Sequence, residues 1–382
     1  MKKYLILIVA VFGFFGFMKF NNDNPKYENI DDLRKIYSSG NSAIWPKPTL
    51  DTLIDKSKFQ DIGSLPKMIF PDNNPLSDEK VKLGKMLFFD PRLSSSNQIS
   101  CANCHNPELG WTDNLTRSFG HDRQTGGRNA MTILNVGYAT SLFWDGRASS
   151  LENQSIMPIQ DQLEMKEHLD IALKKIVKIK GYKTYFEKAF DDKKISLENV
   201  QKAIATFERT ITSPLSRFDK FIAGQSDLLT DQELEGLHLF RTQARCINCH
   251  NTGYFSDNQF HNDGQTLFGT KNEDFGHFKF TQNKQDIGKF RTPSLRETAR
   301  TGPWMHHGHF PSILDVVEFY NLGNPSPIQQ KYVGSQRDSL QGKTSPLLQK
   351  LNLTKPQVKA VVAFINTLAT PNQRMKMPEL PQ

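Results

Sequence analysis

Two copies of the pattern Cys-x-x-Cys-His are the feature that most restricts how this chain folds. They occupy residues 101–105 (CANCH) and 246–250 (CINCH), and they contain all 4 cysteines of the 382-residue sequence. The pattern is typical of covalent attachment of a c-type haem, because two thiols bond to one porphyrin and the next histidine supplies an iron ligand. The sequence therefore predicts two covalently bound haem c groups. The predicted attachment residues are Cys101, Cys104, Cys246 and Cys249, and the predicted axial ligands are His105 and His250.

Two other uses of the cysteines compete with haem attachment. The two pairs could together bind one zinc ion through four thiolates, and each pair alone could form a redox-active dithiol. Neither use requires a histidine directly after each pair, and the long separation of the pairs is unusual for a zinc module. Haem attachment is therefore the preferred interpretation, and it leaves no thiol for a disulfide.

The amino terminus agrees with an exported protein. Lys2 and Lys3 precede an apolar run over residues 4–18, whose length suits a secretion signal better than a membrane-spanning helix. Haem c is attached after export, so the predicted compartment is the periplasm. No clear cleavage site follows, and residues 1–20 are therefore predicted to be either a removed signal peptide or a retained N-terminal membrane anchor.

The charge of the chain argues against a nucleic-acid partner. The formal net charge is +8, but lysine and arginine are spread along the sequence instead of gathering in one stripe. A diffuse positive field suits an acidic electron-donor protein or an anionic surface.

Each motif follows a similar stretch of sequence, which indicates internal duplication. A capped helix is expected after Ser77 and another after Thr230, and each runs through a glycine to Leu-Phe before its motif. Further helices are expected over residues 165–180, 197–211 and 355–368. We therefore predict a mainly α fold with long loops, built from two cytochrome c-like haem domains.

The predicted division of the chain follows from these boundaries. A polar arm or linker over residues 21–75 follows the leader. The first haem domain covers residues 76–224 and the second covers residues 225–382, with the C-terminal helix as a segment that could pack back on the first.

Further motifs, in this order around the two haem sites, resemble those of the bacterial di-haem cytochrome c peroxidases and their MauG-type relatives. The matching segments are 118–121 (SFGH), 127–130 (GRNA), 143–148 (FWDGRA), 164–165 (EM), 292–296 (TPSLR) and 304–308 (WMHHG). The resemblance extends from about residue 76 to residue 368. It implies that the first domain carries the peroxidatic haem and the second carries the electron-transfer haem.

The resemblance also implies roles for residues near the first haem. His121 matches the sixth ligand of the resting peroxidatic iron, which leaves on activation, although a solvent-exposed loop histidine is the alternative. Glu164 and Gln154 match distal-pocket residues, and a carboxyl close to the iron can move the proton that peroxide cleavage requires. For Glu164, a solvated charge at a helix end is the alternative. Trp144 matches a tryptophan between the two haems, and its alternative is simple core packing.

The sixth ligand of the second haem departs from the usual peroxidase pattern, which has a methionine there. The matching residue is Tyr320, and MauG-type proteins use a tyrosine at this place. Ser312 and Asp315 predict a capped helix that turns Tyr320 toward the interior. A phenolate ligand would lower the reduction potential of that haem. The alternative is a core tyrosine, with Met305 or another group on the iron.

Similar proteins also bind calcium at the domain junction. Asn129, Thr301 and Pro303 match the positions around that ion, and their oxygen atoms suit Ca2+. An ordinary hydrogen-bonded loop is the alternative. His306 matches a family residue that would orient a haem propionate or a neighbouring ligand.

The resulting hypothesis is an exported cytochrome-c peroxidase that reduces hydrogen peroxide to water. Its electrons would come from a small redox protein, such as a cytochrome c or a cupredoxin. The first alternative is a MauG-like oxidase of residues on a partner protein, which Tyr320 favours and His121 disfavours. The second is a non-catalytic di-haem electron carrier or redox sensor. The resemblance also implies a homodimer, but the sequence shows no interface.

Overall fold

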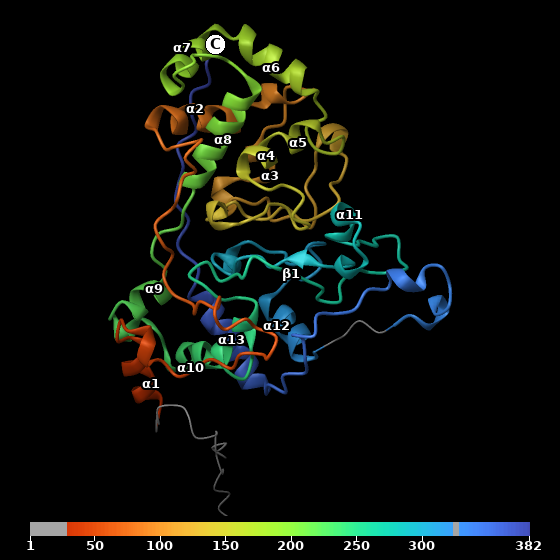
Figure 1. Ribbon diagram of the computed structural model, residues 1–382. Coiled ribbons are helices and arrows are strands. Elements are labelled where there is room, and N and C mark those ends of the chain that lie inside the picture. Colours follow the sequence, from red (N-terminus) through yellow and green to blue (C-terminus); the bar gives the residue numbers. More distant parts are fainter. Residues whose placement is uncertain (1–28, 324–327) are drawn as a thin grey trace, which may run out of the picture.

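The computed structural model describes residues 29–323 and 328–382, so the predicted leader lies outside the described residues. Two helical lobes are stacked on each other, with β1 and α11 between them (Figure 1). The named strands, β1 (Phe260–His261) and β2 (Phe290–Arg291), have two residues each and pair antiparallel. The prediction of a mainly α fold is confirmed. Within the described ranges, no helix is both long enough and apolar enough to cross a bilayer.

The N-terminal lobe is formed by seven helices that surround the first Cys-x-x-Cys-His motif. They are α2 (Asp78–Phe88), α3 (Cys101–Cys104), α4 (Leu151–Ser155), α5 (Met157–Gln160), α6 (Leu169–Lys178), α7 (Lys180–Ala189) and α8 (Leu197–Thr210). The C-terminal lobe contains the second motif and the remaining named α-helices. They are α1 (Ile30–Tyr37), α9 (Arg217–Ile222), α10 (Asp231–Arg241), α11 (Phe278–Thr281), α12 (Ile313–Asn321) and α13 (Lys355–Asn366).

Each lobe is organised around one pair of crossing helices, and the two crossings are alike. Helix α2 packs on α8 in the N-terminal lobe, and α10 packs on α13 in the C-terminal lobe. A Cβ atom added to Gly84 would lie 1.9 Å from the carbonyl oxygen of Ala203. A Cβ atom added to Gly236 would lie at the same 1.9 Å from the carbonyl oxygen of Ala360. Glycine is therefore required at both crossings, because the two helix backbones touch there.

The predicted helix starts agree with the structure. The Ser77 hydroxyl accepts a hydrogen bond from the Lys80 backbone N–H at 3.3 Å and caps α2. Thr230 and Glu233 form a reciprocal capping box at the start of α10. These bonds satisfy backbone donors that have no partner within the helix, which is why local sequence predicts them well.

The predicted helix over residues 165–180 is partly wrong. Helix α6 begins only at Leu169, and Glu164 lies in a turn before it. Lys166 has a φ of 52°, in the left-handed region that a helix cannot accommodate. After α6 ends at Lys178, a separate helix, α7, begins at Lys180.

The first part of the described arm packs closely on the C-terminal lobe, and its end contacts the N-terminal lobe, where the Asn74 amide donates to the Glu152 carboxylate at 2.7 Å. Tyr37 is fully buried. The Arg241 guanidinium donates to the Tyr37 hydroxyl at 2.9 Å and to the Pro46 carbonyl oxygen at 2.7 Å, and it pairs with Asp61. Composition alone predicts only a polar arm or linker here. It cannot show that the buried Arg241 of α10 takes its hydrogen-bond partners from this segment.

Two more segments differ from the predicted division. Phe218 and Phe221 of α9 belong to the core of the C-terminal lobe, so the predicted boundary at residue 225 falls after this helix. The C-terminal helix α13 does not pack back on the first lobe, because its apolar face is used against α10 and α12. The tail after α13 returns instead: the Gly181 N–H donates to the Gln382 carbonyl oxygen at 2.9 Å, beside α7 (Figure 1).

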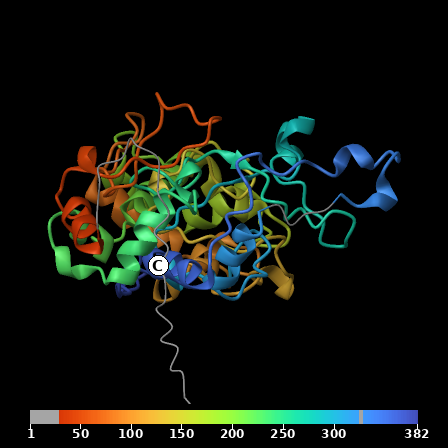
Figure 2. The same ribbon diagram turned by 90° about the horizontal axis from the view of Figure 1, so that it is seen from below.

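The loops after β1 and after α12 form a side extension of the C-terminal lobe, clearest in the view from below (Figure 2). The rings of Phe268 and Tyr332 meet edge to face, with their centroids 4.9 Å apart. The Arg337 guanidinium lies over both rings and pairs with Glu273. These contacts join two loops that lie far apart in the sequence.

Replacing Gly84 with alanine should destabilise the N-terminal lobe, because the new Cβ would overlap the Ala203 backbone. Overpacking of this kind costs about 1–3 kcal/mol. Denaturant unfolding of the haem-loaded protein measures the effect. The control is Gly63→Ala, since no atom lies within 4 Å of a Cβ at that position. Equal stability of the two variants would contradict the close helix crossing.

Candidate functional site

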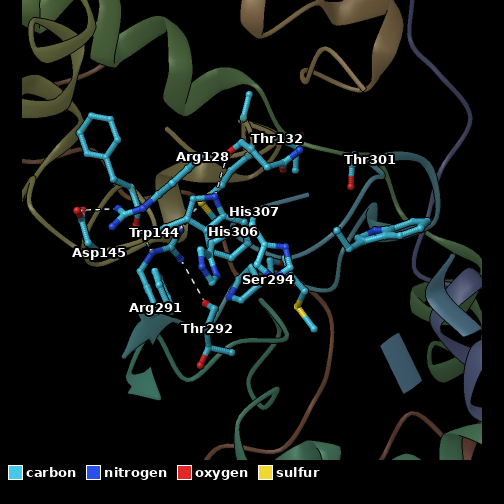
Figure 3. Close-up of a pocket in the computed structure, with 18 of the residues that line it drawn as sticks. Arg128, Thr132, Trp144, Asp145, Arg291, Thr292, Ser294, Thr301, His306 and His307 are labelled. Carbon is cyan, nitrogen blue, oxygen red and sulfur yellow. Dashed lines mark hydrogen bonds and ion pairs between the residues drawn. The ribbon is translucent and has the colours of Figure 1, made fainter. Parts of the chain in front are cut away.

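A cavity of about 900 Å³ is lined by residues of both lobes and by both Cys-x-x-Cys-His motifs. Figure 3 shows part of its wall, where side chains from the two lobes face one another. None of the four cysteines takes part in a disulfide. The six predicted attachment and ligand residues all line the cavity: Cys101, Cys104, His105, Cys246, Cys249 and His250.

The two predicted iron ligands have the same hydrogen bond. The Nδ1–H of His105 donates to the carbonyl oxygen of Trp111 at 3.2 Å, and the Nδ1–H of His250 donates to that of Phe255 at 3.0 Å. Burial lowers the pKa of both imidazoles and favours their neutral form. A neutral ring with its Nδ1–H occupied by a carbonyl has its Nε2 lone pair free for a metal, which is the usual arrangement of a ligating histidine. The residues therefore fit a haem at each motif.

The thiols do not form a four-thiolate zinc site. Burial raises the pKa of Cys104 to about 11 and that of Cys246 to about 12. Among the described residues, the cluster with metal-ligand spacing joins Cys249 with Asp257 and His261, and it contains none of the other cysteines. Protonated thiols in two separate places suit thioether formation better than thiolate coordination of one shared ion.

Glu164 and Gln154 both line the cavity that contains the first motif. Burial raises the pKa of Glu164 to about 7, the nearby Asp161 adds to the rise, and Arg147 opposes it. A carboxyl group that titrates near neutral pH is suited to accepting and returning a proton. The two residues thus stand on the wall of the cavity that contains the first motif, and their catalytic roles stay predictions.

His121 does not line the cavity. Its Nδ1 lies 3.1 Å from the Ser95 hydroxyl, and its Nε2 lies 3.2 Å from the Asp122 carboxylate. Its loop nevertheless rests on the turn that contains Glu164, because a Cβ at Gly120 would lie 1.9 Å from the Leu163 carbonyl oxygen. Iron ligation by His121 stays a prediction. It requires the ring to leave Ser95 and Asp122 and to turn into the cavity.

Trp144 lies where the two lobes meet (Figure 3). Its indole N–H donates to the Asn129 carbonyl oxygen at 2.9 Å, and its own carbonyl oxygen accepts from the Arg291 N–H of the other lobe at 2.8 Å. The indole is edge-on to the His306 ring, with the centroids 6.3 Å apart. Trp144 therefore contacts both lobes along the cavity wall.

An ion-pair network fixes this junction, and the sequence analysis did not identify it. Arg128 pairs with Asp145 of its own lobe and with Asp274 of the C-terminal lobe, both at 2.7 Å (Figure 3 shows the first pair). The Arg128 guanidinium lowers the pKa of Asp274 far below its ordinary value, although burial opposes this. Arg128 and Asp145 stand in motifs that the sequence analysis quotes, but their partner lies far along the chain.

Both candidate ligands of the second iron line the cavity. Tyr320 and Met305 each contribute to its wall. The Ser312 hydroxyl accepts from the Asp315 N–H at 3.1 Å and caps α12, which is one of the two bonds of the predicted capping box. Burial raises the pKa of Tyr320, and Asp263 with the thiols of the second cysteine pair adds to the rise. Tyr320 thus lies near the second cysteine pair, and its ligation of the iron stays a prediction.

The three predicted calcium ligands, Asn129, Thr301 and Pro303, also line the cavity. The Asn129 side-chain amide donates to the Leu115 carbonyl oxygen at 2.8 Å, which is an ordinary loop contact. Calcium binding stays a prediction.

His306 indicates that this wall faces a group other than protein. Its ring is 3% exposed and stacks on Phe290, with centroids 3.7 Å apart. Its buried Nε2 has no hydrogen-bond partner among the described residues. Buried polar atoms are nearly always satisfied. An orphaned atom on the cavity wall therefore agrees with a bound polar group such as a haem propionate.

The chain is similar to known proteins over most of its length. The family model described as di-haem cytochrome c peroxidase matches residues 78–227. The methylamine utilization protein MauG of Methylorubrum extorquens is 36% identical over 329 residues, which are 85% of this chain and 87% of MauG. The cytochrome c551 peroxidase of Nitrosomonas europaea is 36% identical over 316 residues, with coverages of 82% and 86%.

A solved structure agrees with these relatives. A MauG-like protein associated with microbial copper homeostasis superimposes with a TM-score of 0.70 at 29% identity. The match covers 84% of this chain and 96% of that protein.

Replacing Arg128 with glutamine should destabilise the junction, because Asp145 and Asp274, both largely buried, would lose the cation that joins them. Each would keep only a separate second partner, Arg147 for Asp145 and Lys279 for Asp274. Breaking a buried ion pair costs about 3–5 kcal/mol. The control is Lys174→Gln, whose exposed pair with Asp170 contributes under about 1 kcal/mol. Denaturant unfolding of both variants measures the difference. Equal losses would show that the network does not hold the lobes together.

Proposed function

Because the chain belongs to the di-haem cytochrome c peroxidase and MauG family, we propose that it reduces hydrogen peroxide to water. The electrons come from a small redox protein. The observation that carries this proposal is Glu164, a carboxyl group with a pKa of about 7 on the wall shared with the first haem motif. Export to the periplasm is part of the proposal and rests on the apolar run at residues 4–18.

The residues proposed to hold the cofactors are those of the two motifs that line the cavity. His105 with the first cysteine pair holds one haem c, and His250 with the second pair holds the other. When bound, the haems would supply iron centres that accept electrons one at a time from the redox partner and deliver two electrons to the peroxide. The N-terminal lobe, with helices α2 to α8, forms the peroxidatic domain, and the C-terminal lobe, which includes α9, forms the electron-transfer domain. The two alike helix crossings support an origin of these domains by duplication.

Glu164 moves the proton in this proposal. Its carboxylate oxygen accepts a proton from one peroxide oxygen and returns it to the departing oxygen, which leaves as water. The Gln154 amide orients the substrate without exchanging protons. The overall reaction consumes one peroxide, two electrons and two protons and yields two waters. Trp144 connects the two sites, because it contacts both lobes at the cavity wall.

The net positive charge of the chain supports an acidic electron donor. The chain carries a formal net charge of +8. Attraction between a positive protein and an acidic redox partner speeds their encounter, and salt screens it. A cytochrome c or a cupredoxin with an acidic face fits this chemistry.

A second candidate function is oxidation of residues on a partner protein, as in a MauG-like oxidase. Tyr320 favours it, because a phenolate ligand lowers the potential of the second haem and makes it a poor electron store. The 36% identity to a protein named MauG also supports this function, and it equals the identity to the cytochrome c551 peroxidase. Rapid peroxide turnover with a reduced donor favours the first function, whereas covalent change in an external polypeptide favours the second.

Replacing Glu164 with glutamine should lower peroxide turnover by about 10²–10⁴-fold, the contribution of a positioned acid–base group. In the unaltered protein, kcat/KM should rise with pH through about 7, because the ionised carboxylate must accept the first proton. The variant should lose that step. Glu198→Gln, at an exposed site on α8, is the control. Turnover that survives the Glu164 substitution would remove this residue from the mechanism.

Replacing Tyr320 with phenylalanine should change the spectrum of one haem and raise its reduction potential, because an anionic ligand is lost. Spectroelectrochemistry of the mature protein measures both effects. Tyr185→Phe is the matched control in the other lobe, where the ring of Tyr185 lies beside Lys82. If the Tyr320 variant keeps the original spectrum and potential, Tyr320 is a core residue and the ligand is another group.

A further inference from the structure

Glu208 is a buried carboxyl group that the proposed mechanism does not use. It lies in α8, is 4% exposed and contributes to the cavity wall. Its Oε2 atom is buried and has no hydrogen-bond partner among the described residues. Burial of an acid without a partner is costly. A residue that only filled space here would be more stable as an apolar side chain.

The C-terminal lobe contains the matching position with such an apolar side chain. At the two helix crossings, Phe207 of α8 and Phe364 of α13 approach the opposite glycine in the same way: each phenylalanine Cβ is 2.9 Å from the Cβ that the glycine lacks. The next residue is Glu208 in one lobe and Ile365 in the other. Both line the cavity. The packing of the lobes therefore accepts isoleucine at this place, and the acid is specific to the lobe that contains Glu164.

The charged neighbours of Glu208 leave it without an ionic partner. Arg209, the next residue of α8, is paired with Glu152 of α4 at 2.6 Å. Burial raises the pKa of Glu208 to about 8; Arg209 opposes the rise and Glu152 adds to it. On the cavity side, Glu208 and Glu164 both raise the pKa of the Cys101 thiol, a haem-attachment residue of α3. Glu208 therefore acts electrostatically on the first haem site.

We propose that Glu208 binds a proton when the iron held by His105 is reduced and releases it when that iron is oxidised. One electron enters from the external donor and one proton from solvent binds the carboxylate, so the net charge of the buried site is unchanged. Reduction removes a positive charge near the carboxylate, which strengthens its hold on the proton. Glu208 thus compensates the charge of the added electron. It also stores one proton close to the site where peroxide reduction consumes two protons.

This inference rests on the two haems of the proposed function but not on peroxide as the substrate. The test is the reduction potential of each haem between pH 6 and pH 10, measured by spectroelectrochemistry with redox mediators. The potential of the first haem should fall by up to about 59 mV for each tenfold decrease in proton concentration, the value for one proton per electron. Glu208→Gln should remove this component. The same substitution should leave the potential of the second haem, on the side of Ile365, unchanged at every pH. The second haem therefore serves as the control within the same molecule.

Glu164 also titrates near neutral pH, so the comparison is repeated in a Glu164→Gln background, where the contribution of Glu208 should persist. The reciprocal variant, Ile365→Glu, should give the second haem a new dependence on pH, and it decides the question if Glu208→Gln does not mature. A difference between wild type and Glu208→Gln that is the same at every pH would overturn the proposal. Absence of peroxide turnover, with potentials that behave as expected, would overturn only the proposed function.

Discussion

The structure depends on two histidine rings that backbone carbonyls hold in one orientation. His105 and His250 each donate Nδ1–H to a carbonyl oxygen five or six residues later in the chain, which leaves Nε2 free for iron. Both rings line one cavity between facing lobes, and the thiol pair of each motif lies on the same wall. Apolar side chains such as Leu134, Phe240 and Ile365 also line this cavity, so haems bound there would complete the core as well as supply the chemistry.

The two lobes share a scaffold but differ in the residues that face their haems. At the crossings of Gly84 and Gly236, the missing Cβ would lie at the same distances from the opposite helix. Around them, the N-terminal lobe presents Glu164 and Glu208, whereas the C-terminal lobe presents Tyr320. Ionisable groups lie beside both motifs, because Asp263 of the C-terminal lobe is also on the cavity wall and burial raises its pKa to about 6. The lobes differ in that two glutamates stand on the wall of the first and the proposed phenolate ligand stands on the wall of the second.

The sequence predicts best what depends on local spacing. Thiol pairs followed by histidine, and helix caps such as Ser77, are decided within a few residues. The turn of Glu164 was not predicted, because a left-handed Lys166 interrupts an otherwise helical pattern. The packing of the arm on Arg241 and the pairing of Arg128 with Asp274 join distant segments, so no local pattern indicates them. The direction of the His121 ring depends on its contacts with neighbouring loops and also escapes prediction.

The membership of the chain in the di-haem family and the two oriented histidines together imply that each cysteine pair binds one haem covalently. The most direct measurement is the pyridine haemochrome content of the purified, mature protein, expressed per chain and combined with a titration of free thiols. We expect two thioether-linked haems per chain and no reactive thiol. One haem or none, with cysteines that react as free thiols in a properly matured sample, would contradict it.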